Sequence, residues 1–272
     1  MSKSPVESAA EDRRNVDNNS RWRGALGSLF QGVLAAGIGL VIGAIMMNAT
    51  GYDWKEAYRA LWLGSFGDQW GFADTLADAT PLMLTGLGFA LCFRAGYFNI
   101  GAQGQMIMGA LAAVIVGANV AAPTPVAVLL VLVTAAVVGA LWSLPAAFLR
   151  VARGVHEVIT TIMFNWIATY LAAYLVFNVL NDPRSAERTV RVLPEVRLEA
   201  LVPGADATSA LFVSLFVALF FYWLLWHSPW GYEMRVAGLN RNALRYAGAN
   251  PTWSVNLTFL LSGIAAGIAG AT

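Results

Sequence analysis

Long apolar runs constrain this chain more than any other feature of its sequence. A helix that crosses a bilayer needs about 20 predominantly apolar residues, because its backbone polar groups must be paired within the segment. Six runs of sufficient length are present, at 24–48, Ala102–Asn119, 124–149, 155–177, 209–226 and 253–272. A seventh, at 73–93, can span only if Asp74 and Asp78 lie in the headgroup layer. The pattern predicts an all-α integral membrane protein, a polytopic helical bundle with about seven transmembrane helices.

The composition agrees with a membrane protein and excludes other classes. Hydrophobic residues make up 58% and charged residues 12% of the chain, whereas about a quarter of residues are charged in soluble domains. The formal net charge of +1 provides no basic surface for nucleic acid. The single cysteine, Cys92, cannot form an internal disulfide, and no Cys/His cluster has the spacing of a zinc or haem site. We therefore expect neither a nucleic-acid partner nor a metal.

The distribution of basic residues predicts a cytoplasmic N-terminus. With residues 1–23 as a cytoplasmic tail, eleven Lys and Arg residues lie inside and six outside, as the positive-inside rule expects. The loop 179–208 is then extracytoplasmic, and its three prolines favour an ordered cap with little regular helix. The segment 228–250 is cytoplasmic. We expect 24–272 to be the transmembrane domain, incomplete because the chain stops inside an apolar run.

Two shorter segments combine charged and aromatic residues. Trp54–Phe66 has the composition of a short interfacial helix. In 231–251, Asn240 is a plausible N-cap of a two-turn helix over 241–247, Gly248 a C′ residue, and Pro251 the first turn of the next span. This small helix could dock into a partner's groove, or be a surface loop whose arginines meet lipid phosphate. The residues alone favour the surface loop.

The stretch FRAGYFNIGAQGQM, at 93–106, holds glycines and amides within an apolar region. Its glycines let the backbone leave the helix, and Asn99, Gln103 and Gln105 offer partners to the freed backbone groups. Irregular backbone at membrane depth survives only where it is buried in protein or lines a water-filled cavity. One interpretation is therefore a discontinuous helix beside a solute route. The other is a short cytoplasmic turn, and spacing does not decide between them.

The segment GVHEVITTIMFNWIATYL places His156 and Glu157 in the first turn of a helix. A carboxylate is favoured there by the helix dipole, so Glu157 is explained without catalysis. His156 could relay protons, but a lone interfacial histidine is more often solvated. For Asn165 we expect a structural role, within or between helices.

Three segments together resemble a known family. GFALCFRAGYFNIGAQGQMIMGALAA, HEVITTIMFNWIA and GLNRNALRYAGANPTWSVNLTFLLSGIAAGIAGA are similar, in order and spacing, to the permeases of ABC importers for simple sugars, nucleosides and branched-chain amino acids. The resemblance covers roughly 80–272, and the second segment looks most like the nucleoside and simple-sugar branch. Family permeases have further helices after the segment matched here by residues 261–270, which strengthens the expectation of a truncated chain.

The resemblance implies a multi-pass subunit of the bacterial inner membrane. Its partners would be a cytoplasmic ABC ATPase, a second permease copy or a paralogous permease, an extracytoplasmic solute-binding protein, and membrane lipid. ATP and Mg²⁺ would be used by the ATPase, no cofactor would be bound by this chain, and the chain would not be an enzyme. The chain indeed contains no G-x-x-x-x-G-K-[ST] phosphate loop.

The resemblance also implies two sets of site residues. The broken helix would supply the substrate pathway, from Phe98, Asn99, Gln103 and Gln105. The segment 228–250 would be the region that couples to the ATPase, which overrides the surface-loop interpretation. The residues assigned to coupling are Gly238, Asn240, Arg241, Ala243, Tyr246 and Gly248.

Two other classes fit the sequence less well than an importer permease. A secondary transporter or channel for a small polar solute is the alternative, but ion-coupled carriers usually hold an ionisable residue within the membrane, and the interiors of the clear spans have none. An intramembrane enzyme is disfavoured because no nucleophile and base pair stands out.

Overall fold

The computed structural model describes residue 27, residues 30–182 and residues 185–272. Among these residues, seven helices are long and apolar enough to cross a membrane. The prediction of an all-α bundle with about seven spans is therefore confirmed. The described residues fall into two compact units, one ending at Gly67 and the other beginning at Asp68. The predicted tail, 1–23, lies outside the described residues.

The described part of the first unit contains two helices, the spanning helix Phe30–Ala49 and α2 (Trp54–Phe66). Gly51, at a φ of 84°, allows the turn between them, and the Asp53 side chain caps α2 by accepting from two backbone amides. The Tyr58 hydroxyl donates to the Leu40 carbonyl and ties the helices together. The helix predicted at Trp54–Phe66 is confirmed, and its interfacial position stays a prediction.

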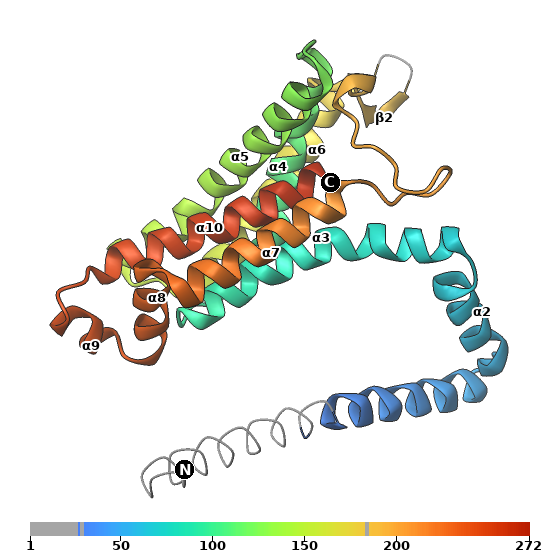
Figure 1. The fold of residues 1–272 in the computed structure, drawn as a ribbon, viewed down its shortest axis with the longest axis horizontal. Coiled ribbons are helices and arrows are strands. Elements are labelled where there is room, and N and C mark those ends of the chain that lie inside the picture. The colour runs from blue at the N-terminus through green and yellow to red at the C-terminus, as the bar shows by residue number, and fades with distance from the viewer. Residues whose placement is uncertain (1–26, 28–29, 183–184) are drawn as a thin grey trace, which may run out of the picture. The chain divides into compact units, whose positions relative to one another are not determined.

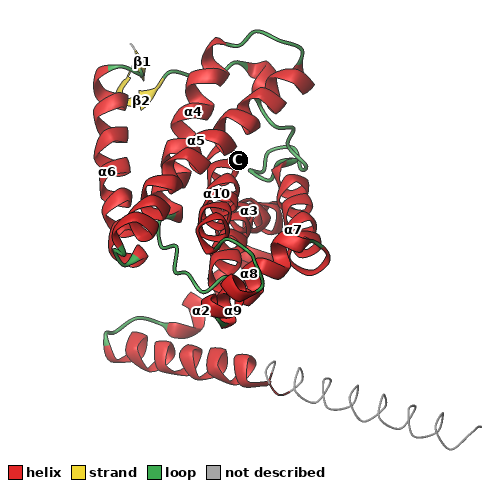
Figure 2. Cartoon of the chain, turned by 90° about the vertical axis from the view of Figure 1, so that its left-hand side faces the viewer, coloured by secondary structure: helices red, strands yellow, loops and turns green. Residues whose placement is uncertain are grey.

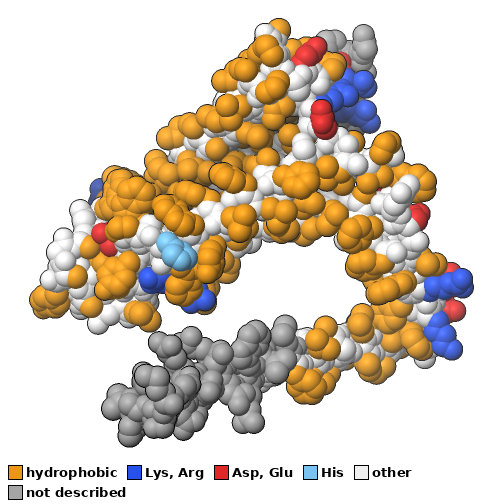
Figure 3. All heavy atoms as spheres, viewed as in Figure 1, with side chains coloured by type: hydrophobic (Ala, Val, Ile, Leu, Met, Phe, Trp, Pro, Cys, Tyr) orange, Lys and Arg blue, Asp and Glu red, His pale blue; other side chains and the backbone are white. Residues whose placement is uncertain are grey.

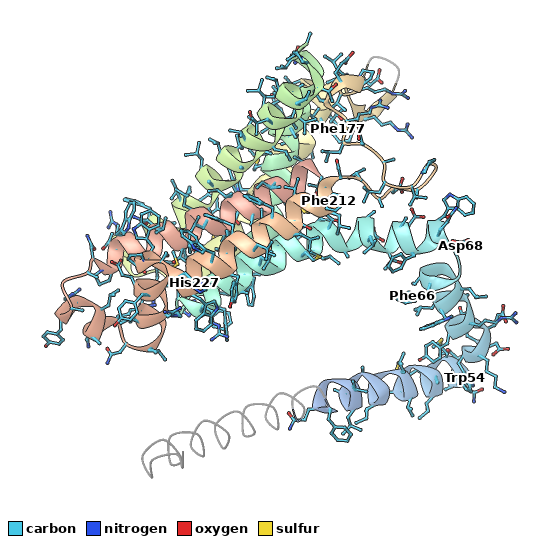
Figure 4. The ribbon with its side chains drawn as sticks, in the orientation of Figure 1. Trp54, Phe66, Asp68, Phe177, Phe212 and His227 are labelled. Carbon is cyan, nitrogen blue, oxygen red and sulfur yellow. The ribbon has the colours of Figure 1, made fainter. Side chains whose placement is uncertain are left out.

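The second unit holds the other spans and the elements that connect them (Figures 1 and 2). Its spanning helices are α3 (Gln69–Arg94), α4 (Ala102–Asn119), α5 (Thr124–Arg153), α6 (Glu157–Asn178), α7 (Ala210–His227) and α10 (Pro251–Ala271). Figure 4 labels Phe212 and His227 near the two ends of α7. Apolar side chains cover the visible flanks of these helices, and charged side chains gather at their ends (Figure 3).

The central helix of this unit is α10, which packs against α3, α4 and α5. Small residues on α10 make the approach possible. A Cβ atom at Gly267 would lie 2.2 Å from the Ala135 carbonyl oxygen, and one at Gly263 would lie 2.6 Å from that of Gly139. Such spacing of small residues is expected where helices pack in lipid by van der Waals contact. Around these contacts, a buried cluster that includes Leu84, Leu91, Met234 and Phe259 completes the core.

The connection between α6 and α7 is mostly irregular in its described residues. It contains the antiparallel pair β1 (Asn181–Asp182) and β2 (Ser185–Thr189) and one turn of 3₁₀ helix, η1 (Pro194–Val196). The Asp206 amide donates to the Asp74 carboxylate over 2.9 Å, which fastens the connection to the first turns of α3. The prediction of little regular helix agrees with this structure.

The segment 228–250 contains more helix than expected. The sequence predicted a helix only from Arg241, whereas α8 (Pro229–Leu239) precedes α9 (Arg241–Tyr246). The Ser228 side chain caps α8 by accepting from the Gly231 amide over 3.0 Å. Two glycines and polar residues masked this helix in the sequence. Packing against α3, α7 and α10 stabilises it, with Met234 and Ala237 buried.

Candidate functional site

The helix break predicted within FRAGYFNIGAQGQM lies at residues 95–101, named here the buried loop. It joins two separate spanning helices, α3 and α4, each continuous over its length. Gly96, at a φ of 79°, ends α3, and the Tyr97 amide donates back to the Cys92 carbonyl over 2.9 Å. Tyr97 and Asn99 are fully buried. The loop is therefore a connection between two spans and not an interruption within one, and its side chains alternate between buried (Tyr97, Asn99) and exposed (Phe98, Ile100).

An amide side chain of the buried loop, Asn99, pairs with Gln105 in the first turn of α4. Asn99 and Gln105 exchange two hydrogen bonds of 3.3 Å, each side chain donating once and accepting once. Asn99 also donates to the Ser262 hydroxyl of α10 over 2.9 Å and accepts from the Gly101 amide at 2.9 Å. Buried polar groups that are satisfied in this way rigidify a structure. The network holds the loop against α10.

Asn165 of α6 fastens the loop from another side. Its side-chain oxygen Oδ1 accepts from the Gly104 backbone amide at 2.8 Å, and its side-chain nitrogen Nδ2 donates to the Ile100 backbone carbonyl at 2.9 Å. The first four amides of a helix lack intrahelical partners, and Gly104 is the third residue of α4, so Asn165 satisfies a group that would otherwise be unpaired. The structural role expected of Asn165 is the one observed.

The structure separates the four residues assigned to the substrate pathway. Asn99 and Gln105 are buried and paired with each other. Gln103 is exposed on α4, because residues two apart on a helix point to nearly opposite sides. Phe98 is 44% exposed, and its ring packs edge-on against Phe93 at 5.4 Å between centroids. The four residues therefore do not form one cluster within this chain.

Glu157 is a residue whose contacts sequence reasoning missed. It is only 3% exposed, its Oε1 atom accepts from the Phe98 amide at 3.3 Å, and its Oε2 atom lies 3.2 Å from Nε of Arg150. The carboxylate thus links the end of α5 to the buried loop. The sequence did contain a signal for the ion pair, because Arg150 precedes Glu157 by seven residues and Gly154 breaks the helix between them. The helix dipole alone had been sufficient to explain Glu157. His156 is exposed, and its Nδ1 atom accepts from the Val158 amide at 3.4 Å.

The segment 228–250, named here the coupling segment, lies directly on the buried loop. A Cβ atom at Gly238 would lie 2.2 Å from the Arg94 carbonyl oxygen, and one at Gly96 would lie 3.0 Å from the Gly238 Cα. Arg241 donates to the Gly96 carbonyl at 3.4 Å, and its Cζ atom lies 4.6 Å from the Tyr97 ring centroid. Burial raises the pKa of the Tyr97 phenol above its ordinary value, so the ring is neutral under the guanidinium. A displacement of the coupling segment would therefore reach the loop by direct contact.

The small helix α9 has the caps that the sequence predicted. The Asn240 side chain accepts from the amides of Asn242 at 2.9 Å and Ala243 at 3.2 Å, and Gly248 has a φ of 82°. Leu244 is buried, whereas Tyr246 is 92% exposed. Of the residues assigned to coupling, those of α9 thus lie at the surface, and Gly238 instead faces the buried loop. In the described part of the chain, no group of three or more His, Cys, Asp or Glu residues could hold a metal ion.

Comparison with known proteins finds relatives among ABC transporter permeases. A family model described as the permease component of branched-chain amino acid transport systems matches residues 71–272. The guanosine ABC transporter permease protein NupP of Bacillus subtilis is 36% identical over 90% of this chain and 72% of its own length. The glucose ABC transporter permease protein TsgB13 of Haloferax volcanii is 33% identical over 97% of this chain and 71% of its own length. The nucleoside ABC transporter permease protein NupB of Lactococcus lactis is 27% identical over 88% of this chain and 68% of its own length.

No solved structure matches the chain. The family model nevertheless covers most of the chain, including every helix from α4 onward, the buried loop and the coupling segment. The resemblance inferred from the three sequence segments is confirmed. The chain is a multi-pass membrane protein, and it belongs to the family of permease components of branched-chain amino acid transport systems.

Proposed function

We propose that the chain is the membrane-spanning subunit of an ATP-driven importer and forms the translocation pathway for a nucleoside or a simple sugar by alternating access. The similarity to guanosine, nucleoside and glucose permeases supports the solute class. The contact of Gly238 with the backbone of Arg94 and Gly96 is the observation that supports the coupling mechanism. It provides a route by which movement at the surface reaches a buried loop between two spans.

In this proposal the coupling segment binds a cytoplasmic ATPase, which uses ATP and Mg²⁺. The exposed side of α9 with Ala243 and Tyr246, together with Leu239, 89% exposed at the end of α8, is the docking face. A second permease, identical or paralogous, completes the pathway in the bacterial inner membrane. An extracytoplasmic binding protein delivers the solute.

Gln103 and Phe98 are the pathway residues with exposed side chains. A neutral amide and an aromatic edge suit the hydroxyls and ring of a nucleoside or sugar. Asn99 and Gln105 act differently, since their hydrogen bonds are used within the protein. They hold in place the backbone of the buried loop and the first turn of α4, from which Phe98 and Gln103 project.

The proposed function predicts ATP-dependent uptake by the complete importer in proteoliposomes. With its ATPase, partner permease and binding protein, the wild type should accumulate radiolabelled guanosine or glucose and exclude leucine. Gln103→Leu should lower uptake about fivefold, the worth of one neutral hydrogen bond, without loss of assembly. An ATPase variant unable to hydrolyse ATP is the control. Uptake driven by an ion gradient in that control would instead support the secondary transporter.

The proposed orientation predicts the labelling of two single cysteines in a Cys92→Ala background. Glu199→Cys, in the connection between α6 and α7, should react with an impermeant maleimide in intact cells, and Asn242→Cys should not. Both positions are exposed, so both should react in opened membranes. Labelling at position 242 in intact cells would show that the orientation is inverted.

A further inference from the structure

A cavity of about 410 Å³ opens where α5 ends, α9 lies and α10 begins. Three guanidinium groups line it, from Arg150, Arg241 and Arg245, and no acidic residue is among its lining residues. Arg241 and Tyr97 in its lining also join the coupling segment to the buried loop, whereas the proposed transport mechanism gives no role to Arg245 or to the cavity itself. Its charge favours an anionic ligand.

Two of the three arginines of the cavity form no ion pair within the described chain. Arg150 lies 3.2 Å from the Glu157 carboxylate. Arg241 contacts only a carbonyl and the Tyr97 ring through its guanidinium, and neither Arg241 nor Arg245 forms an ion pair with a described residue. Two positive charges are therefore available for a ligand, and a phosphate matches the geometry of paired guanidinium groups.

The position of the cavity indicates which phosphate would reach it. Its walls include Val151 in the last turn of α5, and Pro251 and Val255 in the first turns of α10. Both helices are spans, so the cavity lies at the depth of the lipid headgroups, with apolar side chains beside the arginines. Basic pockets between spanning helices at this depth bind phospholipid headgroups.

The two sides of α9 keep this cavity apart from the proposed ATPase contact. Arg241 and Arg245 are one turn apart and line the cavity. At about 100° per residue, Ala243 lies about 200° and Tyr246 about 140° around the helix axis from Arg241. An ATPase bound to Ala243 and Tyr246 would leave the cavity open to lipid.

We propose that this cavity binds the phosphate headgroup of an anionic phospholipid from the cytoplasmic leaflet. The leaflet rests on the proposed orientation, whereas lipid binding does not depend on which solute is transported. Arg245 and Arg241 bind the phosphate, and Val151 and Val255 contact the start of the acyl chains. The bound lipid then holds α9 against the ends of α5 and α10.

The test uses the purified full-length importer and native mass spectrometry with dioleoyl phosphatidylglycerol or dioleoyl phosphatidylcholine. The wild type should bind phosphatidylglycerol in preference to phosphatidylcholine. Arg245→Gln should weaken phosphatidylglycerol binding about fivefold, the contribution expected of one basic residue at a membrane surface. Arg245→Lys should retain most of the binding. Arg153→Gln is the matched control, because Arg153 is exposed at the end of α5 but does not line the cavity.

Three outcomes would overturn the proposal. Equal phosphatidylglycerol binding by wild type and Arg245→Gln would show that the cavity is not the site. Displacement of the lipid by glycerol 3-phosphate at equal concentration would assign the site to a soluble phosphate. Unchanged lipid binding with reduced recovery of the ATPase would assign Arg245 to a protein carboxylate. Failure of guanosine or glucose uptake with the expected lipid binding would contradict only the proposed solute class.

Discussion

Gly267→Leu should lower the apparent melting temperature of the purified permease by about 10 °C, corresponding to roughly 3 kcal/mol of overpacking. A Cβ atom at Gly267 would lie 2.2 Å from the Ala135 carbonyl oxygen and 3.1 Å from the Gly139 Cα. The atoms in the way belong to the backbone of α5, so no side-chain rotation can relieve the contact. The helices must separate, and the measurement is loss of the folded, monodisperse fraction during heating in detergent.

Gly86→Ala in α3 is the matched control for this experiment. A Cβ atom at Gly86 meets no neighbouring side chain or helix within 4 Å. Alanine is also favoured over glycine inside a helix by about 1 kcal/mol, so this variant should melt at or above the wild-type temperature. If Gly267→Leu melts together with Gly86→Ala, then α10 does not pack on α5 as described.

Gly238→Ala should lower solute uptake on the order of tenfold while the ATPase remains bound. The added methyl group would lie 2.2 Å from the Arg94 carbonyl oxygen and 3.1 Å from the Gly96 amide nitrogen. The coupling segment would be forced away from the buried loop without any change on the exposed side of α9. Uptake in proteoliposomes and recovery of the ATPase on the tagged permease are measured in parallel.

Ala243→Trp separates docking from transmission. A bulky ring on the exposed side of α9 should prevent the ATPase from binding, so both recovery of the ATPase and uptake fall. Gly238→Ala should reduce uptake alone. Loss of ATPase binding in both variants would mean that Gly238 acts by holding the docking face, and normal uptake in both would remove the coupling segment from the mechanism.

The spans could be predicted from the sequence because each depends on the composition of one continuous segment. The caps of α9 were also local, since Asn240 bonds to amides two and three residues away. The helix α8 was missed for the opposite reason. Its own residues are only weakly apolar, and burial of Met234 and Ala237 against three other helices stabilises it.

The candidate site was less predictable because its decisive contacts join distant residues. Asn99 meets Ser262 across 163 positions, and Gln105 turns inward while Gln103 turns outward. Nothing local distinguishes the two glutamines. Likewise, the helix dipole at the start of α6 is enough to explain a carboxylate at Glu157. Its contacts with Arg150 and the Phe98 amide were therefore not predicted.

The Asn99–Gln105 pair has a consequence for biosynthesis. Ser262, on α10, is translated more than 150 residues after Asn99, so α3 and α4 enter the bilayer before this partner exists. During that interval the Asn99 amide would lack this partner, and an unpaired amide shielded from water costs on the order of a few kcal/mol. Because the two side chains are only six positions apart, they can bond to each other as soon as the hairpin leaves the translocon. The pair can therefore satisfy both amides until α10 has been synthesised and packs against the loop.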